Sequence, residues 1–122
     1  MILVDSSVWI DHLRGATADL TGLLEEGRVL VHPFVIGELA LGSLRQRESV
    51  LQSLRDLPQA VMAEDAEILD FIDRHALFGL GIGYIDVHLL ASVRLTPDAS
   101  LWTRDRRLQD AALRMGLAVP GS

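Results

Sequence analysis

Residues 1–10 read MILVDSSVWI, and this stretch decides the fold of the chain. Ile2-Leu3-Val4 is an apolar run of the length expected for a fully buried strand. Asp5-Ser6-Ser7 then supplies side chains that favour a helix start, and we predict a first helix over Val8 to Leu13 that ends at Gly15. A buried strand that passes directly into a helix is typical of a layered α/β fold.

The rest of the chain repeats this alternation. We expect further strands at residues 29–31, 60–62, 101–103 and 117–119, and further helices at 17–26, 33–41, 44–57, 64–78, 84–94 and 106–115. Short buried strands between helices indicate a mostly parallel central sheet, here of four to five short strands with helices on both faces. Because no repeat or linker interrupts the pattern, residues 1–122 are expected to form one domain.

Composition narrows the classes of protein that remain. The chain has no cysteine, which excludes disulfides, thiolate zinc sites, iron–sulfur clusters and cysteine nucleophiles. No apolar run is long enough to cross a membrane, and the start MILVD lacks the pattern of a signal peptide, so a cytoplasmic protein is expected. The net charge of −6 is unusual for a partner of nucleic acid. Acids gathered around bound cations would account for part of it.

Two carboxylates lie on helix faces where a charge is costly. The neighbours of Glu38 at three and four positions are Phe34, Val35, Leu41 and Gly42, and those of Asp86 are Ile82, Gly83, Leu89 and Leu90. Neither acid has a cation beside it on its own helix. A distant arginine could pair with either acid, but the two anomalies together favour a binding site for a cation.

Two further acids follow predicted strands. Asp5 comes directly after the first strand, and Asp105 follows the strand that ends at Thr103. Each could simply cap the helix that comes next, and for Asp105 that is the stronger alternative. Ligands of open α/β sheets, however, bind at the carboxyl ends of the strands. Four acids meeting in one crevice would suit Mg²⁺ or Mn²⁺, which prefer oxygen ligands.

Four segments carry a resemblance to a known family. In chain order they are Ile2–Ile10 (ILVDSSVWI), Gly37–Leu39 (GEL), Gly83–Ala91 (GYIDVHLLA) and Leu101–Leu108 (LWTRDRRL). Their order and spacing closely resemble the PIN-domain family and, within it, the VapC-type toxins of bacterial toxin–antitoxin pairs. Each motif is modest alone, but the four together are specific and span essentially the whole chain. The resemblance implies a PIN-like fold.

The resemblance also implies an activity and a set of ligands. It implies an endoribonuclease that hydrolyses RNA phosphodiester bonds with Mg²⁺ or Mn²⁺ and is held inactive by a cognate antitoxin. Asp5 and Asp86 would be the primary metal ligands, and Glu38 and Asp105 would complete the acidic site, directly or through water. None of these four positions departs from the pattern of the family.

Supporting and partner-binding residues follow from the same resemblance. Ser7 and Thr103 would be hydroxyl supports near Asp5 and Asp105. A homodimer is implied, and a toxin–antitoxin hetero-oligomer in which apolar grooves receive the antitoxin. Trp9, Leu13 and Leu41 are candidates for the groove and, equally, for the core. Four arginines in one C-terminal stretch are compatible with contacts to RNA phosphate and equally with an ordinary surface: Arg104, Arg106, Arg107 and Arg114.

Several other signals are weaker. The run GLGIG at residues 79–83 follows a helix rather than a strand, so it is not a dinucleotide-binding loop. The four histidines show no ligand spacing: His12, His32, His75 and His88. His88 lies two residues after Asp86 and therefore points away from it, as a surface or structural residue. The acids between residues 64 and 73 are most simply a solvated helix face.

Three other functions compete with that of a ribonuclease toxin. A haloacid-dehalogenase-like phosphohydrolase needs a second acid two residues after the first, where this chain has Ser7. A PIN nuclease that matures RNA and is not a toxin would have the same site. A catalytically idle module that binds only proteins would not need the four acids to be intact.

Overall fold

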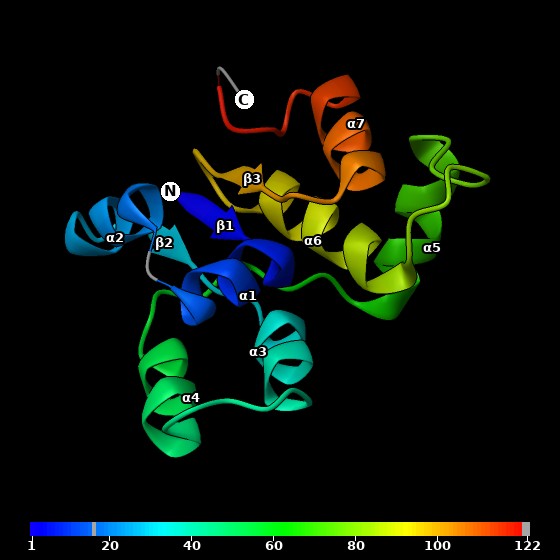
Figure 1. Ribbon diagram of the computed structural model, residues 1–122. Coiled ribbons are helices and arrows are strands. Elements are labelled where there is room, and N and C mark those ends of the chain that lie inside the picture. Colours follow the sequence, from blue (N-terminus) through cyan, green and yellow to red (C-terminus); the bar gives the residue numbers. More distant parts are fainter. Residues whose placement is uncertain (16, 121–122) are drawn as a thin grey trace.

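The computed structural model describes residues 1–15 and 17–120, and its centre is a three-stranded parallel sheet (Figure 1). The strands are β1 (Ile2–Val4), β2 (Val29–Leu30) and β3 (Ser100–Trp102), in the order β2-β1-β3. Both neighbours of β1 pair with it in parallel. The predicted α/β character and the parallel pairing are therefore confirmed.

The prediction of four to five strands is wrong for the described residues. The segments expected at 60–62 and 117–119 reach the sheet only through single bridges, Val31 with Gln59 and Leu101 with Ala118. Val61 and Met62 are each 46% exposed, so this segment lacks the buried side chains of a strand. The backbone N–H of Val61 donates to the Thr96 hydroxyl instead of to a neighbouring strand.

Seven helices surround the sheet in the described part of the chain. They are α1 (Ser6–Arg14), α2 (Ala18–Glu25), α3 (Pro33–Ala40), α4 (Arg47–Arg55), α5 (Asp65–Arg74), α6 (Tyr84–Leu95) and α7 (Arg106–Arg114). Each corresponds to a predicted helix, with ends that differ by a few residues. The largest difference is at α5, which ends four residues earlier than predicted, and α4 starts three residues later than predicted, after Gln46 with its left-handed φ of 51°.

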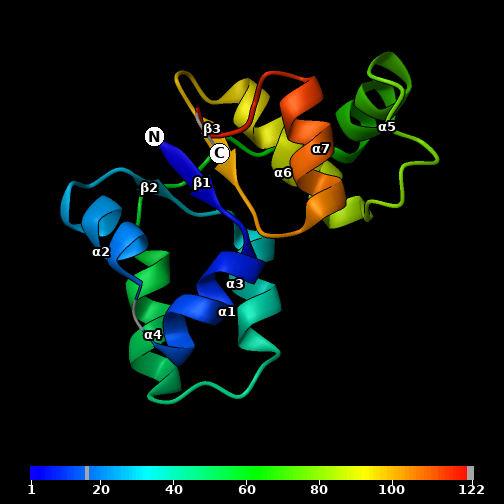
Figure 2. The same ribbon diagram turned by 45° about the horizontal axis from the view of Figure 1, so that its top comes forward.

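The helices gather in two groups around the sheet. In both views α5, α6 and α7 lie on one side of the sheet and α1 to α4 lie on the other (Figures 1 and 2). The core joins the two groups through fully buried residues of β1 and α6, among them Leu3, Val4, Leu89 and Leu90. Burial of such side chains contributes roughly 1.5–3 kcal/mol each, so the centre of the sheet is the most stable part of the fold.

The sheet register determines which side chains meet at the carboxyl ends of the strands. Val4 of β1 pairs with Trp102 of β3, and the backbone N–H of Asp5 donates to the carbonyl of Trp102 at 2.9 Å. The residues that follow these two strands are therefore adjacent, although about a hundred positions separate them in the sequence. In the described residues, no helix is both long and apolar enough to span a bilayer.

Candidate active site

Asp5 is the buried centre of the candidate site. Its side chain is 5% exposed, and its Oδ2 accepts hydrogen bonds from the hydroxyls of Ser7 at 2.8 Å and Thr103 at 2.7 Å. Its Oδ1 has only a 3.5 Å contact with the Ser6 hydroxyl. Asp5 occupies the position before α1, yet its side chain makes no capping hydrogen bond. Capping therefore does not explain this residue.

Ser7 and Thr103 connect Asp5 to the loop after β3. The Ser7 hydroxyl accepts the backbone N–H of Arg104 at 3.0 Å, and the Thr103 hydroxyl accepts that of Asp105, also at 3.0 Å. The two hydroxyls lie 3.4 Å apart. Each hydroxyl thus receives a backbone donor and directs its own proton to Asp5, which fixes the orientation of that carboxylate.

Glu38 and Asp86 come from two helices that face this centre. Glu38 Oε1 accepts a hydrogen bond from the Ser6 hydroxyl at 3.2 Å. Asp86 Oδ2 accepts one from the backbone N–H of Gly83, also at 3.2 Å. Burial raises the pKa of both carboxyls, and the charge of Asp5 raises both further. Glu38 is also affected by the charge of Asp86, so these acids are close enough to repel one another.

Asp105 has two functions at once. Its Oδ1 accepts the backbone N–H of Leu108 at 3.1 Å, so Asp105 caps α7. This confirms the stronger of the two alternatives that the sequence offered for this residue. Its charge also contributes to the raised pKa of Asp86, which places it near the other acids. A residue can cap a helix with one oxygen and keep the other for a ligand.

The four acids form what we call the carboxylate site: Asp5, Glu38, Asp86 and Asp105. In each, a hydrogen bond from the protein holds one oxygen, and the second oxygen makes at most the long Ser6 contact among the described residues. None of the four forms an ion pair within the described ranges. Unpaired acids that repel one another are suited to a cation.

The carboxylates are near one another without being packed together. Within residues 1–15 and 17–120, no three acid or histidine side chains are arranged so that they could hold a metal ion at once. Mg²⁺ commonly binds through one or two carboxylates and completes its shell with water and substrate phosphate. The oxygen-only donor set and its spacing are compatible with that form of binding.

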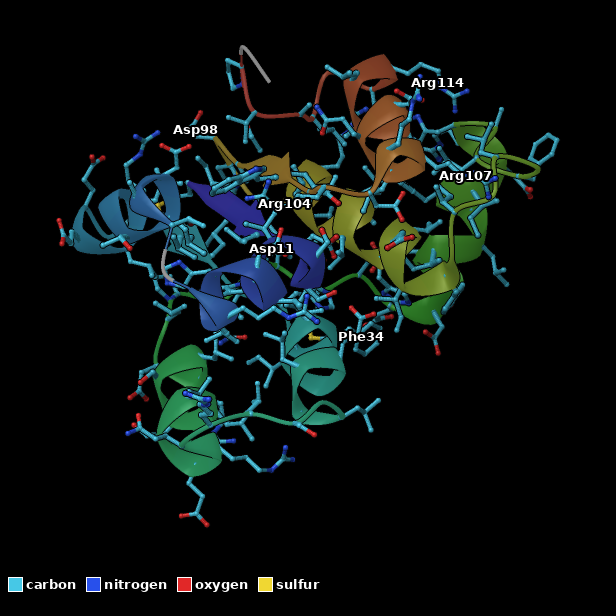
Figure 3. The ribbon with its side chains drawn as sticks, in the orientation of Figure 1. Asp11, Phe34, Asp98, Arg104, Arg107 and Arg114 are labelled. Atoms are coloured by element: carbon cyan, nitrogen blue, oxygen red, sulfur yellow. The ribbon has the colours of Figure 1, made fainter. Side chains whose placement is uncertain are left out.

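The four predicted RNA-binding arginines have four different environments. Arg104 forms an ion pair with Asp11, with Nε and Oδ2 2.9 Å apart, and Figure 3 shows the two side chains directed toward one another. Arg106 is exposed and makes no hydrogen bond or ion pair within the described residues. Arg107 lies against the backbone of Gly81. Arg114 donates to the carbonyls of His75 and Ala76, away from the acids.

The three residues predicted for an antitoxin groove also have different environments. Trp9 is 4% exposed and belongs to the core, so its assignment to a groove is wrong. Leu13 lines a groove of about 620 Å³ that also contains Glu38. Leu41 is 90% exposed but is not among the residues that line that groove.

The structure also contains features that the sequence did not indicate. Ser6 contacts both Asp5 and Glu38, and its position next to Asp5 was the one available signal. His88 is buried among Phe34, Tyr84 and His32, so the structural interpretation of this residue is confirmed and the surface one is wrong. The acids at residues 64–73 are exposed, as predicted.

Comparison with known proteins agrees with this geometry. The model of the PIN domain family matches residues 2–113. Two curated proteins of Mycobacterium tuberculosis, from strains CDC 1551/Oshkosh and ATCC 25618/H37Rv, are both named ribonuclease VapC32. Each is 49% identical to this chain over 119 residues, which cover 98% of this chain and 96% of the relative.

Proposed function

The chain belongs to the PIN-domain family, and on that premise we propose that it is a metal-dependent endoribonuclease, the toxin of a VapC-type toxin–antitoxin pair. The observation that carries the proposal is the carboxylate site, whose four acids have no cation partner among the described residues. Identity of 49% over nearly the full length of a relative named a ribonuclease supports the same chemistry.

The four acids would hold a divalent metal ion. We assign Asp5 and Asp86 as primary ligands and Glu38 and Asp105 as further ligands, directly or through water. An oxygen-only donor set favours a hard cation, which leads to Mg²⁺ or Mn²⁺. When bound, such an ion lowers the pKa of a coordinated water and offsets charge on the scissile phosphate.

The residues around Asp5 prepare it for this task. Ser7 and Thr103 occupy its Oδ2, so Oδ1 is the oxygen available to a ligand. Ser6 orients Glu38, and the backbone of Gly83 orients Asp86. Because these side chains are held before any ligand arrives, little conformational entropy is lost on binding.

The partner surfaces follow from the same family. The groove of about 620 Å³ is lined by apolar side chains of α1, α3 and the segment into α4, among them Ile10, Leu13, Leu39, Leu44 and Val50. Arg14 and Arg45 also line it. We assign this groove to the cognate antitoxin, which would bind here beside Glu38. A toxin homodimer, a toxin–antitoxin hetero-oligomer and action in the cytoplasm belong to the same proposal.

The activity can be tested on the purified protein. We expect cleavage of single-stranded RNA in the presence of Mn²⁺ or Mg²⁺, with loss on addition of EDTA. Asp86→Asn should lower the rate by roughly 10³-fold or more, since several kcal/mol of metal-derived stabilisation are lost. Asp73→Asn, an exposed acid outside the site, is the control and should cleave normally. Cleavage that persists in EDTA and in Asp86→Asn contradicts the proposal.

A growth experiment separates the toxin from an RNA-maturation nuclease. Expression of the chain alone should arrest growth, and co-expression of the protein encoded beside it should restore growth. Arrest should also disappear with Asp86→Asn. An active nuclease whose expression leaves growth unchanged would belong to RNA maturation instead.

A further inference from the structure

The turn before α6 contains a glycine that a side chain of α7 covers. Gly81 has φ of +76°, in the left-handed region, and Gly79 in the same turn has φ of +73°. A Cβ added at Gly81 would lie 2.5 Å from Nη1 and 3.1 Å from Cζ of Arg107. A Cβ added at Gly79 would meet nothing within 4 Å. Of these two glycines, only Gly81 is in a position where an added Cβ would displace a neighbouring side chain.

The covering side chain is Arg107, in the first turn of α7. Its guanidinium rests on the Gly81 backbone, and Figure 3 shows Arg107 between α7 and the loop that joins α5 to α6. In the described ranges it forms no ion pair, and its donors have no hydrogen-bond acceptor. The side chain is exposed, and its packing on the glycine leaves the N–H groups of the guanidinium unused.

Arg107 and the glycine that its guanidinium contacts are close in sequence to two of the acids. Arg107 is two residues after Asp105, and Gly81 is two residues before Gly83, whose N–H holds Asp86. The contact between Arg107 and Gly81 thus joins the segments that carry Asp105 and Asp86. The guanidinium therefore lies on the loop and the helix start that lead to two of the four acids.

An acidic site needs such a cation if it is to accept RNA. The chain has a net charge of −6, and the carboxylate site repels phosphate until metal is bound. Arg104 is already paired with Asp11. Arg106 is free of partners in the described residues but has no contact that limits its conformation. Of the three, Arg107 combines unused donors with a packing contact, the one with Gly81.

We propose that Arg107, held on Gly81, binds a backbone phosphate of the RNA strand next to the one that is cleaved. The guanidinium presents planar, paired N–H donors that match two phosphate oxygens. Gly81 is then a positioning residue, because a side chain at that position would displace the guanidinium. This inference rests on the proposed function and adds to it a named contact for the substrate.

Paired glycine variants test the inference directly. Binding of fluorescein-labelled single-stranded RNA of mixed sequence is measured by fluorescence anisotropy in an Asp86→Asn background, so that cleavage does not intervene. We expect Gly81→Ala to raise the Kd about fivefold to tenfold, the loss of one charge-assisted contact. Gly79→Ala places alanine in an equally left-handed position without touching Arg107, and should leave the Kd within about twofold.

Arginine variants provide a second test in the same RNA-binding experiment. Arg107→Ala should weaken binding as much as Gly81→Ala, and the double variant should be no weaker than either. In Arg107→Ala the slope of log Kd against log salt should fall by about 0.7, as expected for one lost phosphate contact on a single strand. Arg106→Ala removes the neighbouring charge without the glycine contact, and should have a smaller effect on both quantities.

The outcomes distinguish this inference from the proposed function. Equal effects of Gly81→Ala and Gly79→Ala would overturn the role of the contact, and equal effects of Arg106→Ala and Arg107→Ala would overturn the choice of arginine. Wild-type protein that cleaves RNA while all these variants bind normally sinks this inference alone. Protein that binds RNA through Arg107 but never cleaves it would sink the proposed function and leave the inference standing.

Discussion

The helices α3 and α6 each contribute to two polar regions of opposite character. One is the carboxylate site, which receives Glu38 from α3 and Asp86 from α6. The other is a histidine cluster, in which His32 caps α3 and His88 lies on α6. Phe34 and Tyr84 complete the cluster, each with its ring centroid 4.8 Å from that of His88. Both regions draw polar groups from the same two helices, but the histidines are buried, whereas Glu38 is exposed and Asp86 is half-buried.

The two regions also differ in charge, because a buried imidazole becomes neutral by releasing its proton, whereas a carboxylate is charged without one. Burial lowers the pKa of His32 to about 4 and also lowers that of His88, so both imidazoles are neutral at pH 7. Three of their ring nitrogens, His32 Nε2 and both of His88, are buried without a hydrogen-bond partner among the described residues. Carboxylates near neutral pH keep their charge, which the proposed cation would offset. On the proposed function, the histidine cluster contributes to packing and the carboxylate site binds a cation.

Substitutions at His88 would have the largest effect on this comparison. His88→Ala should reduce the free energy of unfolding by about 3 kcal/mol, because it leaves a cavity among Phe34, Tyr84 and His32. His88→Leu should stay within about 1 kcal/mol of wild type, since it fills the space and removes two nitrogens without a hydrogen-bond partner, although Nε2 lies 3.7 Å from the exposed carboxylate of Asp65. Urea denaturation of the metal-free protein measures both. If leucine costs as much as alanine, the imidazole makes a polar interaction and the cluster is not simply packing.

The pH dependence of stability should reveal His32. Its pKa in the folded protein, about 4, is below the ordinary 6.5, so the unfolded chain takes up a proton first as the pH falls. His32 therefore contributes stability above pH 6.5, and this is lost as the pH falls from 6.5 toward 4. Between pH 7 and pH 5 the loss should be about 1–2 kcal/mol. Burial is its main cause, and repulsion from His88 adds to it.

His32→Asn isolates that contribution. Asparagine can still cap α3, as the His32 ring does now by accepting the N–H of Phe34 at 3.0 Å. The fall in stability between pH 7 and pH 5, measured by urea denaturation, should become shallower by about 1 kcal/mol or more. An unchanged slope would mean that His32 is not the group responsible.

The smallest effect should come from Glu38 and should have the opposite sign. The raised pKa of Glu38 means that the folded protein holds its proton longer, so metal-free stability falls as the pH rises above 4.5. Glu38→Gln should therefore stabilise the metal-free protein at pH 7, by about 0.5 kcal/mol or roughly 2 °C in Tm once solvent screening is considered. Thermal melts by circular dichroism would detect this change.

Metal provides the control for that measurement. Mn²⁺ should raise the Tm of wild type more than that of Glu38→Gln, because the variant has one ligand fewer. Asp73→Asn, at an exposed acid of α5, should change neither value. A Glu38→Gln variant that is less stable than wild type without metal would show that the carboxylate is stabilised by its surroundings, as in an ordinary structural hydrogen bond.

Much of the fold was predictable because its signals are local. Apolar runs such as Ile2–Val4 and stop signals such as Gly15 depend on neighbouring residues only, and the helices and three strands follow them. The predicted strands near Val61 and Ala118 failed because strand formation needs a partner of matching length. Each segment found only one bridge at the edge of a short sheet.

The carboxylate site was predictable for a different reason. Glu38 and Asp86 were conspicuous because a charge on an apolar helix face is costly, and the sequence displays that conflict directly. The hydrogen-bond partners of these acids were harder to predict from the sequence. Ser6, the partner of Glu38, was not predicted, because it is a common residue whose function depends on the direction of its hydroxyl group.

The amino-acid sequence by itself determined the order of the helices and strands, the type of fold and the identity of the acids, since these depend on residue type and periodicity. Only the tertiary structure decided which distant groups meet. It placed Asp5 beside Thr103, 98 positions later, put His88 in the core, and set Arg107 against Gly81. Such contacts depend on strand register and helix packing, which no single segment of the chain specifies.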